Sequence, residues 1–323
     1  MSVEIIRIGT RKSDLAVAQT RLVASLLEKG QPQIQTELVL KQTVGDKILN
    51  KPLLEFGGKG VFVSEFEQGL ADGQIDLAVH SAKDLPMDLK EGLEIIAVPE
   101  REDPRDVLVT RKKEDLSQKT EIIIGTSSPR RKVQIEEIGK KLWPHACIRC
   151  ENLRGNVNTR LKRLQEGGYD AILLAAAGLK RLGFLEKDSQ ELEPFSLQYL
   201  SCEEFIPAGG QGILAVEGRA QDSRTKMLCA GAENKAARLS LQTERMVLKL
   251  LDAGCHEPIG VYTRLQEKEL ELFGICGRNG QIRKVHLSAP MDQWESLAMQ
   301  AAKHLSGNRK TEEEKGGQSY GRN

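Results

Sequence analysis

Two arginine-rich segments, each placed between a β-like run and a helix-like run, constrain the fold of this chain most. Gly125–Arg131 (GTSSPRR) follows EIIIG and precedes KVQIEEI, and Leu153–Arg160 (LRGNVNTR) follows ACIRC and opens TRLKRLQEG. Helix starts normally favour acidic residues, because free N–H groups and the helix dipole make that end positive. Arginines at such positions indicate a bound anion, which guanidinium, hydroxyl and backbone N–H groups would hold together.

Strand and helix signals alternate through the first two thirds of the chain. Ser13 is placed to cap an amphipathic helix that ends at Gly30. A second helix is predicted over Val63–Asp72, and strands over Glu4–Gly9, Thr36–Gln42, Leu77–His80 and Leu93–Val98. The pattern predicts an α/β fold with mainly parallel or mixed sheets covered by helices on both faces. In such sheets ligands bind beyond the C-terminal ends of the strands, where both arginine segments fall.

Composition excludes several classes of protein. The 323 residues are 39% hydrophobic and 29% charged with a net charge of +1, which is typical of a globular protein and not of a general polyanion binder. The N-terminus lacks the apolar core of a signal peptide, and the longest apolar run, 171–178, is far shorter than the ~20 residues of a membrane span. Six cysteines without regular spacing favour a reducing cytoplasm. Cys147 and Cys150 would face opposite sides of a strand, so we expect no metal site.

The segment HSAKDLP, residues 80–86, directly follows a strand-like run and places Ser81, Lys83 and Asp84 at its end. At the C-terminal end of a strand, Asp84 is a candidate general acid or base. The alternative is a solvated lysine–aspartate pair of little consequence.

Three further residues have a functional and a structural interpretation. Cys255 lies in the Gly/Pro-rich loop LDAGCHEPIG, where an accessible thiol is a candidate nucleophile or attachment point; the alternative is a buried loop cysteine. Arg11 follows the first strand and is otherwise a surface arginine. Lys59 lies in FGGKGVF, which lacks the spacing of a phosphate-binding P-loop, so nucleotide binding is rejected.

Taken together, the segments RIGTRKS, GGKGVF, HSAKDLP, GTSSPRR, LRGNVNTR, AAAGLKRLG, PAGGQG and GCHEPIG resemble the porphobilinogen deaminase (hydroxymethylbilane synthase) family. The resemblance covers about residues 4–290, in the family's order. It implies two periplasmic-binding-protein-like domains with the active-site cleft between them and a small α+β C-terminal domain. The implied domain limits are 1–102 with 199–221, 103–198 and 222–305, followed by a disordered tail over 306–323.

The resemblance also implies the chemistry. Cys255 would carry a dipyrromethane cofactor through a thioether, and four porphobilinogens would be joined to it head to tail, each releasing ammonia, before hydrolysis yields 1-hydroxymethylbilane. Asp84 would be the catalytic carboxylate that assists ammonia loss and stabilises the cationic pyrrole intermediates. The residues expected to bind the carboxylates of substrate and cofactor are Arg11, Ser13, Lys59, Ser81, Lys83, Thr126, Ser127, Ser128, Arg130, Arg131, Arg154, Arg160 and Arg181.

Two other functions compete with this one. A non-catalytic two-lobed module for a small dicarboxylate would explain the arginines but gives no reason for Cys255 or Asp84. A nucleic-acid binder would show a steep salt dependence of affinity. The expectation is a cytoplasmic monomer whose partner is the substrate porphobilinogen, with no nucleic acid, membrane or metal.

Overall fold

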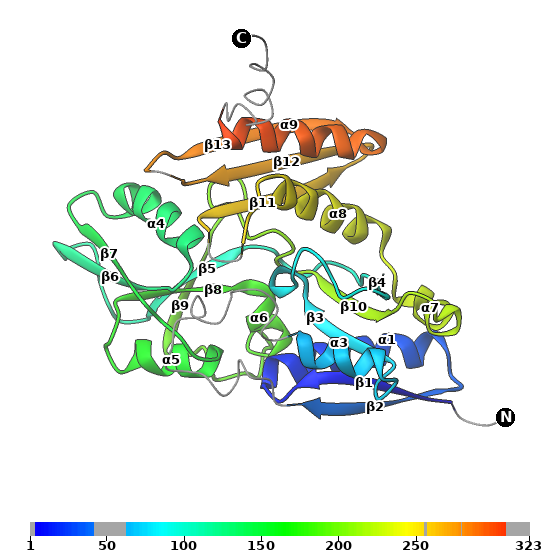
Figure 1. Cartoon of the computed structure of the whole chain (residues 1–323). Coiled ribbons are helices and arrows are strands. Elements are labelled where there is room, and N and C mark those ends of the chain that lie inside the picture. The colour runs from blue at the N-terminus through cyan, green and yellow to red at the C-terminus, as the bar shows by residue number, and fades with distance from the viewer. Residues whose placement is uncertain (1–3, 42–62, 255–256, 279, 308–323) are drawn as a thin grey trace, which may run out of the picture.

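The described residues fold around three β-sheets with helices packed on them (Figure 1). The computed structural model describes residues 4–41, 63–254, 257–278 and 280–307. Two of the sheets have five strands and the third has three. The predicted α/β fold with mixed sheets and a small C-terminal α+β domain is therefore confirmed.

The first five-stranded sheet is covered by helices on both faces. Its strands, in spatial order, are β2 (Ile34–Lys41), β1 (Glu4–Arg11), β3 (Leu77–Ser81), β10 (Leu214–Arg219) and β4 (Leu93–Ala97). β1 pairs in parallel with β2 and β3, whereas β10 pairs antiparallel with β3 and β4. Helix α1 (Asp14–Gly30) packs on one face through Val23 and Leu27, and α3 (Ser64–Ala71) packs through Phe66 on a separate core cluster. Helix α7 (Ser223–Cys229) belongs to the same core as α1.

The second five-stranded sheet repeats this order with residues from the middle of the chain. Its strands are β7 (Cys147–Glu151), β6 (Glu121–Gly125), β8 (Ala171–Ala175), β5 (Asp106–Arg111) and β9 (Phe195–Tyr199). β6 is parallel to β7 and β8, and β5 is antiparallel to β8 and β9. Helix α4 (Pro129–Leu142) packs in one core cluster, and α5 (Val157–Gln165) and α6 (Ala176–Arg181) pack in another.

The chain passes twice between these two sheets. The first passage, residues 98–105, joins β4 to β5, and the second, residues 200–213, joins β9 to β10. β10 lies between β3 and β4 in the first sheet, although it follows all strands of the second sheet in the chain. The two passages lie next to each other, since the N–H of Glu102 donates to the carbonyl of Gly212 at 3.0 Å.

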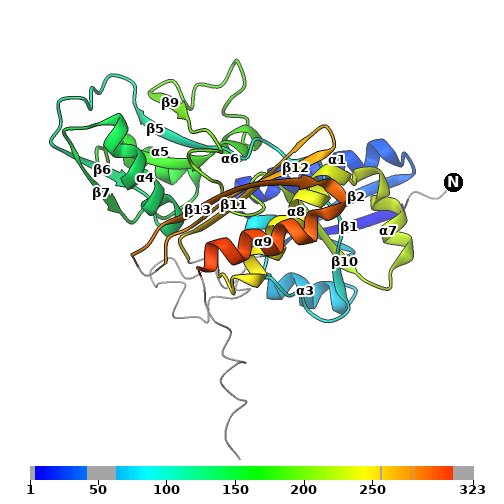
Figure 2. The same cartoon turned by 90° about the horizontal axis from the view of Figure 1, so that it is seen from above.

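The C-terminal part is a three-stranded antiparallel sheet with two helices packed side by side on one face. β11 (Ile259–Gln266), β12 (Glu269–Cys276) and β13 (Arg283–Pro290) follow in chain order. Helices α8 (Lys235–Leu250) and α9 (Trp294–Ser306) share a core with them, and Figure 2 shows both helices along the strands. The N-terminal half of α8 also packs against the first five-stranded sheet, through Ala237 and Leu241.

Local capping explains where the helices near the site begin. The side chains of Ser13, Ser128 and Asn156 accept hydrogen bonds from backbone N–H groups at the starts of α1, α4 and α5. Pro129 occupies the first turn of α4, where no N–H is needed. Arg130 and Arg131 therefore lie inside the first helical turn instead of preceding it.

Candidate active site

Asp84 is exposed at the end of a loop that is anchored on both sides. It is the last residue of η2 (Ala82–Asp84), a single 3₁₀ turn that directly follows β3. Ala82 and Leu85 are buried, and the N–H of Ala82 donates to the carbonyl of Ile213 at 3.0 Å. These anchors hold the Asp84 carboxylate at the C-terminal edge of the first sheet.

A small cavity of about 50 Å³ opens beside Asp84. Arg11, Gln19, His80 and Ser81 line it together with Asp84. The cavity lies where the parallel strands β1 and β3 end and where α1 and α3 begin, and both features favour an anion there. The side-chain amide of Gln19 donates to the Ser81 hydroxyl at 2.9 Å, which fixes that hydroxyl. The Ser13 hydroxyl caps α1 by accepting from the N–H of Ala16 at 3.4 Å.

Lys83 lies between charged groups of both domains. Burial lowers the pKa of its ammonium to about 8; the nearby Asp84 opposes this effect, while Arg131 adds to it. The Lys83 ammonium donates to the side-chain oxygen of Gln211, at 3.5 Å, in the second passage between the sheets. Lys83 is therefore a cation held where its own charge is disfavoured, which is a place for an anionic ligand.

Arg130 and Arg131 bind a carboxylate of the protein itself. Both are buried, and both donate to Asp106 at the start of β5, with distances of 2.8 Å from Arg130 Nη1 to Oδ2 and 2.6 Å from Arg131 Nη2 to Oδ1. Burial alone would raise the pKa of Asp106, but the two guanidinium groups lower it to about 2. The sequence analysis assigned Arg130 and Arg131 to the binding of an anionic ligand. In the structure their anion is Asp106, and their contact with a ligand stays a prediction.

Arg160 and Arg181 are half-buried cations without a carboxylate partner among the described residues. Burial lowers the pKa of each guanidinium to about 10. Arg160 Nε donates to the carbonyl of Gly155 at 2.8 Å, and Arg181 Nη2 donates to that of Gly212 at 2.6 Å. Arg181 Nε is buried with no hydrogen-bond partner in the described structure. These two arginines are suited to bind carboxylates brought by a ligand.

The remaining predicted binding residues join the two arginine segments. The Ser127 hydroxyl donates to the carbonyl of Leu153 at 3.0 Å, which ties the first segment to the second. Thr126 is buried, and its hydroxyl accepts from the N–H of Ser128 at 3.2 Å. Arg154 is exposed between β7 and α5. The parallel pairing of β6 with β7 therefore brings both segments to one edge of the second sheet.

Two predicted residues, Lys59 and Cys255, lie outside the described residues. Across the ranges that the structure covers, no group of three or more His, Cys, Asp or Glu side chains is arranged to hold a metal ion. Within the same ranges, no helix has the length and hydropathy that a membrane span requires.

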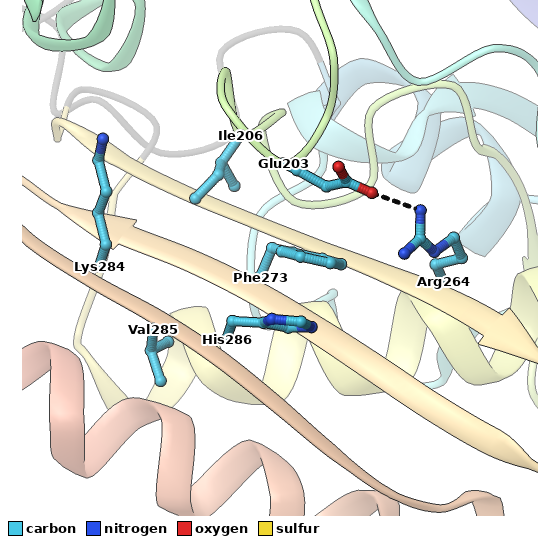
Figure 3. A pocket seen from close by; sticks show the side chains of 7 residues that line it. All are labelled: Glu203, Ile206, Arg264, Phe273, Lys284, Val285 and His286. Carbon is cyan, nitrogen blue, oxygen red and sulfur yellow. Dashed lines mark hydrogen bonds and ion pairs between the residues drawn. The ribbon is translucent and has the colours of Figure 1, made fainter.

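A larger hollow lies away from Asp84, between the C-terminal sheet and the second passage (Figure 3). Phe273 and His286 stack in its floor with ring centroids 4.2 Å apart. Its charged side chains are paired: Arg264 with Glu203 at 2.7 Å, and Lys284 with Glu137 at 2.8 Å. The charges of Arg264 and Lys284 in this hollow are therefore neutralised by carboxylates of the protein itself.

Sequence reasoning missed the residues that support the site from a distance. Asp106, Gln211 and Glu244 are buried polar residues that connect the two passages to their surroundings. Asp106 ends the charged break PEREDPRD, and Gln211 lies in the PAGGQG segment, so both were within motifs that had been noted. Nothing in the sequence marks Glu244 within α8, because its partners are distant in the chain.

The described residues form an α/β protein with two similar five-stranded sheets and a smaller third sheet, in which the exposed carboxylate of Asp84 lies beside a small cavity at the end of β3. The family model described as "Porphobilinogen deaminase, dipyromethane cofactor binding domain" matches residues 6–227. The model of the porphobilinogen deaminase C-terminal domain matches residues 239–307. The chain therefore belongs to the porphobilinogen deaminase family.

Individual relatives agree with the family models. A porphobilinogen deaminase from Syntrophobacter fumaroxidans is 44% identical over 276 residues, which are 85% of each chain. One from Acetivibrio thermocellus is 42% identical over 305 residues, 93% of this chain and 97% of the relative. A solved structure, the probable amino-acid ABC transporter extracellular-binding protein ytmK from Bacillus subtilis, aligns with a TM-score of 0.39 at 12% identity and covers 77% of this chain and 97% of that one.

Proposed function

We propose that this chain is a hydroxymethylbilane synthase, a transferase of tetrapyrrole and haem biosynthesis. It joins four porphobilinogens head to tail on a covalent dipyrromethane primer, releases ammonia at each step, and hydrolyses the product to 1-hydroxymethylbilane. The observation that carries this proposal is the exposed Asp84 carboxylate together with Arg160 and Arg181, two half-buried cations that have no carboxylate partner among the described residues. Family membership supplies the identity of the substrate.

The charge of the substrate fits these cations. Each porphobilinogen carries an acetate and a propionate, so every addition brings two more carboxylates into the protein. Lys83, Arg160 and Arg181 are held where burial disfavours their charge, and a carboxylate beside each would offset that cost. Arg11 and Ser81 line the cavity next to Asp84 and are assigned to the carboxylates of the reacting pyrrole.

The same residues fit the dipyrromethane, which is itself a polycarboxylate. It supplies the free pyrrole α-carbon to which the first substrate is joined. Cys255 is assigned as its attachment residue. Three other thiols support this choice, because desolvation raises the pKa of the half-buried Cys150 to about 11 and of the half-buried Cys202 and the buried Cys229 to about 12, so these three are poor nucleophiles at neutral pH.

Asp84 is assigned the chemistry because its carboxylate is exposed to the cavity while its backbone is fixed. A carboxylate there accepts hydrogen bonds from the substrate ammonium and pyrrole N–H groups, and it stabilises the positive charge that develops when ammonia leaves. After the new carbon–carbon bond has formed, it removes the proton from the pyrrole α-carbon. Arg11 and the helix starts of α1 and α3 hold the substrate carboxylates in the meantime.

The mass of the intact purified chain tests the proposal. A covalent dipyrromethane adds the mass of two pyrrole units, and Cys255→Ala removes that addition. Cys147→Ala is the matched control, since Cys147 is an exposed thiol on β7 and should leave the added mass in place. An unmodified wild-type chain would contradict the proposal and favour a dicarboxylate-binding module instead.

Asp84→Asn separates binding from chemistry. The variant should keep the added mass, while turnover falls about 10²–10⁴-fold, the usual contribution of a positioned acid–base group. Asp88→Asn on the same loop is the control, because Asp88 is 79% exposed and forms a surface ion pair with Lys249. Wild-type turnover in Asp84→Asn would remove this residue from the mechanism.

We also propose that the enzyme acts as a monomer in the cytoplasm, with the domain limits implied by the family resemblance. The five described cysteines are free thiols, as is usual in a reducing compartment. Light scattering on the primed enzyme across a range of concentrations tests the first point. A concentration-dependent dimer that alone is active would contradict it.

A further inference from the structure

A buried histidine–glutamate pair forms part of the wall of the cavity that contains Asp84. His80 precedes the last residue of β3, and Glu217 lies on the neighbouring antiparallel strand β10. His80 Nε2 is 2.9 Å from Glu217 Oε2, and the two side chains are 8% and 0% exposed. The ring of Phe66 meets the imidazole edge-on, with centroids 5.9 Å apart.

Packing alone does not explain why a carboxylate, and not an apolar side chain, occupies the buried position 217. Its second oxygen, Oε1, is buried and has no hydrogen-bond partner among the described residues. A buried carboxylate with one partner costs folding free energy that an amide or an apolar side chain would not cost. The neighbour on which its charge acts is the His80 imidazole.

His80 connects this charge to the cavity. Its side chain lines the cavity together with Arg11, Ser81 and Asp84. Glu217 occupies Nε2, and no described residue forms a hydrogen bond with Nδ1. A carboxylate behind one ring nitrogen holds the imidazole in one orientation and one tautomer, with the other nitrogen as the proton acceptor, and it stabilises the imidazolium once that proton arrives.

We propose that His80 is the second proton-transfer group of this site and that Glu217 is its positioning residue; this inference rests on the proposed function. In each addition the C–N bond of the substrate breaks, with its electron pair going to nitrogen, and a C–C bond forms to the free α-carbon of the growing chain. That α-carbon must then lose a proton. The proton passes through Asp84 to His80 Nδ1 and from there to solvent, where the ammonia released earlier takes up a proton as ammonium, so that His80 is neutral for the next cycle.

Single-addition kinetics on the primed enzyme test the inference, with porphobilinogen as the probe and pH varied from 6 to 9. His80→Gln should lower the rate of one addition about 100-fold, within the range of acid–base groups, while KM changes less than about twofold. Glu217→Gln keeps a hydrogen-bond acceptor for Nε2 but removes the charge. Its rate should fall about tenfold, as for other groups that orient a functional histidine, and the acid limb of its pH–rate profile should move to lower pH.

The shift follows because the His80 imidazolium loses the negative charge that stabilises it, so a neutral acceptor persists to lower pH. The other charged groups that line the cavity with His80, Asp84 on η2 and Arg11 on β1, are unchanged in this variant. His286→Gln is the matched control, since His286 lies near a glutamate, Glu271, at 3.5 Å on the C-terminal sheet. Its rate and profile should equal those of the wild type.

Each outcome decides the question. A purely structural pair would lower the melting temperature and the rate of Glu217→Gln without moving the profile, and that result would overturn the inference. Wild-type kinetics in His80→Gln would do the same. If His80→Gln fails to fold, the profile of the nearly isosteric Glu217→Gln carries the test. Failure of the proposed function is distinguishable, because wild-type enzyme would then form no product.

Discussion

Lys83 and Asp84 are adjacent in the chain but lie in different environments. Asp84 is exposed, whereas Lys83 is half-buried among the charges of both domains. The carboxylate is thus accessible to the substrate, whereas burial lowers the pKa of the ammonium to about 8. This difference arises within the short turn over Ala82–Asp84, in which Ala82 is buried, Lys83 half-buried and Asp84 exposed.

The pKa of Lys83 predicts how substrate binding depends on pH. Because burial lowers this pKa to about 8, Lys83 is a cation at pH 7 and loses its charge as the pH rises through 8. A carboxylate that it binds is then released, so we expect KM for porphobilinogen to rise several-fold between pH 7.5 and 9. Lys83→Arg should keep KM flat over this range, because a guanidinium stays charged. Initial-rate measurements check this, and an identical rise in Lys83→Arg would contradict it.

At the scale of the elements, sequence patterns predicted most helices and strands but not their order. Apolar spacing and the Ser13 cap predicted α1 with its observed end at Gly30. Strands β9 and β10 were not anticipated, because their pairing with β5 and β4 depends on residues far apart in the chain. The antiparallel strand in each sheet arises where the chain returns from the other sheet, and no local signal encodes that return.

The arginines at the start of α4 show the same limit for the site. Their positions predicted an anionic ligand, which stays a prediction, and the sequence could not show that Asp106 lies opposite them on β5. That contact depends on the antiparallel pairing of β5 with β8, next to β6. A cluster of arginines in the sequence indicates that an anion neutralises them. When that anion is a side chain distant in the chain, the cluster does not show which side chain it is.

Asp106→Asn should strongly destabilise the second domain. Asp106 is fully buried and accepts from both Arg130 and Arg131, so the amide would leave two buried guanidinium groups without their counter-charge. We expect the free energy of unfolding to fall by about 3–5 kcal/mol, as when one partner of a buried ion pair is removed. Urea denaturation measures this change.

The control and the pH dependence are specific to the buried pair. Asp103→Asn should have a much smaller effect, because Asp103 pairs with a partly exposed Arg105. Asp106 has a pKa of about 2 in the folded state against a reference value of 3.8, so its stabilisation is complete above pH 4 and is lost as the pH falls through 2. Equal losses in both variants would show that Asp106 contributes no more than a surface pair.

At the scale of the whole molecule, one carboxylate joins both passages to the C-terminal domain. Glu244 on α8 is fully buried. It accepts from Arg101 Nη1 in the first passage at 2.6 Å, from the N–H of Gly210 in the second at 2.6 Å, and from the N–H of Thr263 on β11 at 2.8 Å. The two passages that link the five-stranded sheets are therefore hydrogen-bonded to the C-terminal domain through Glu244.

Glu244→Gln tests whether this carboxylate couples the domains. A glutamine side chain can accept from Arg101 and Thr263 through its oxygen, but its NH₂ group would face the N–H of Gly210, two donors in contact. We expect the free energy of unfolding to fall by about 3–5 kcal/mol. If the two passages couple elongation to the C-terminal domain, enzyme-bound intermediates of this variant should accumulate at fewer pyrroles. Native mass spectrometry at limiting substrate resolves these species.

Lys249→Gln on the same helix removes only a surface ion pair and should match the wild type. If Glu244→Gln lost stability but kept the wild-type distribution of intermediates, Glu244 would be a structural tie without a part in elongation.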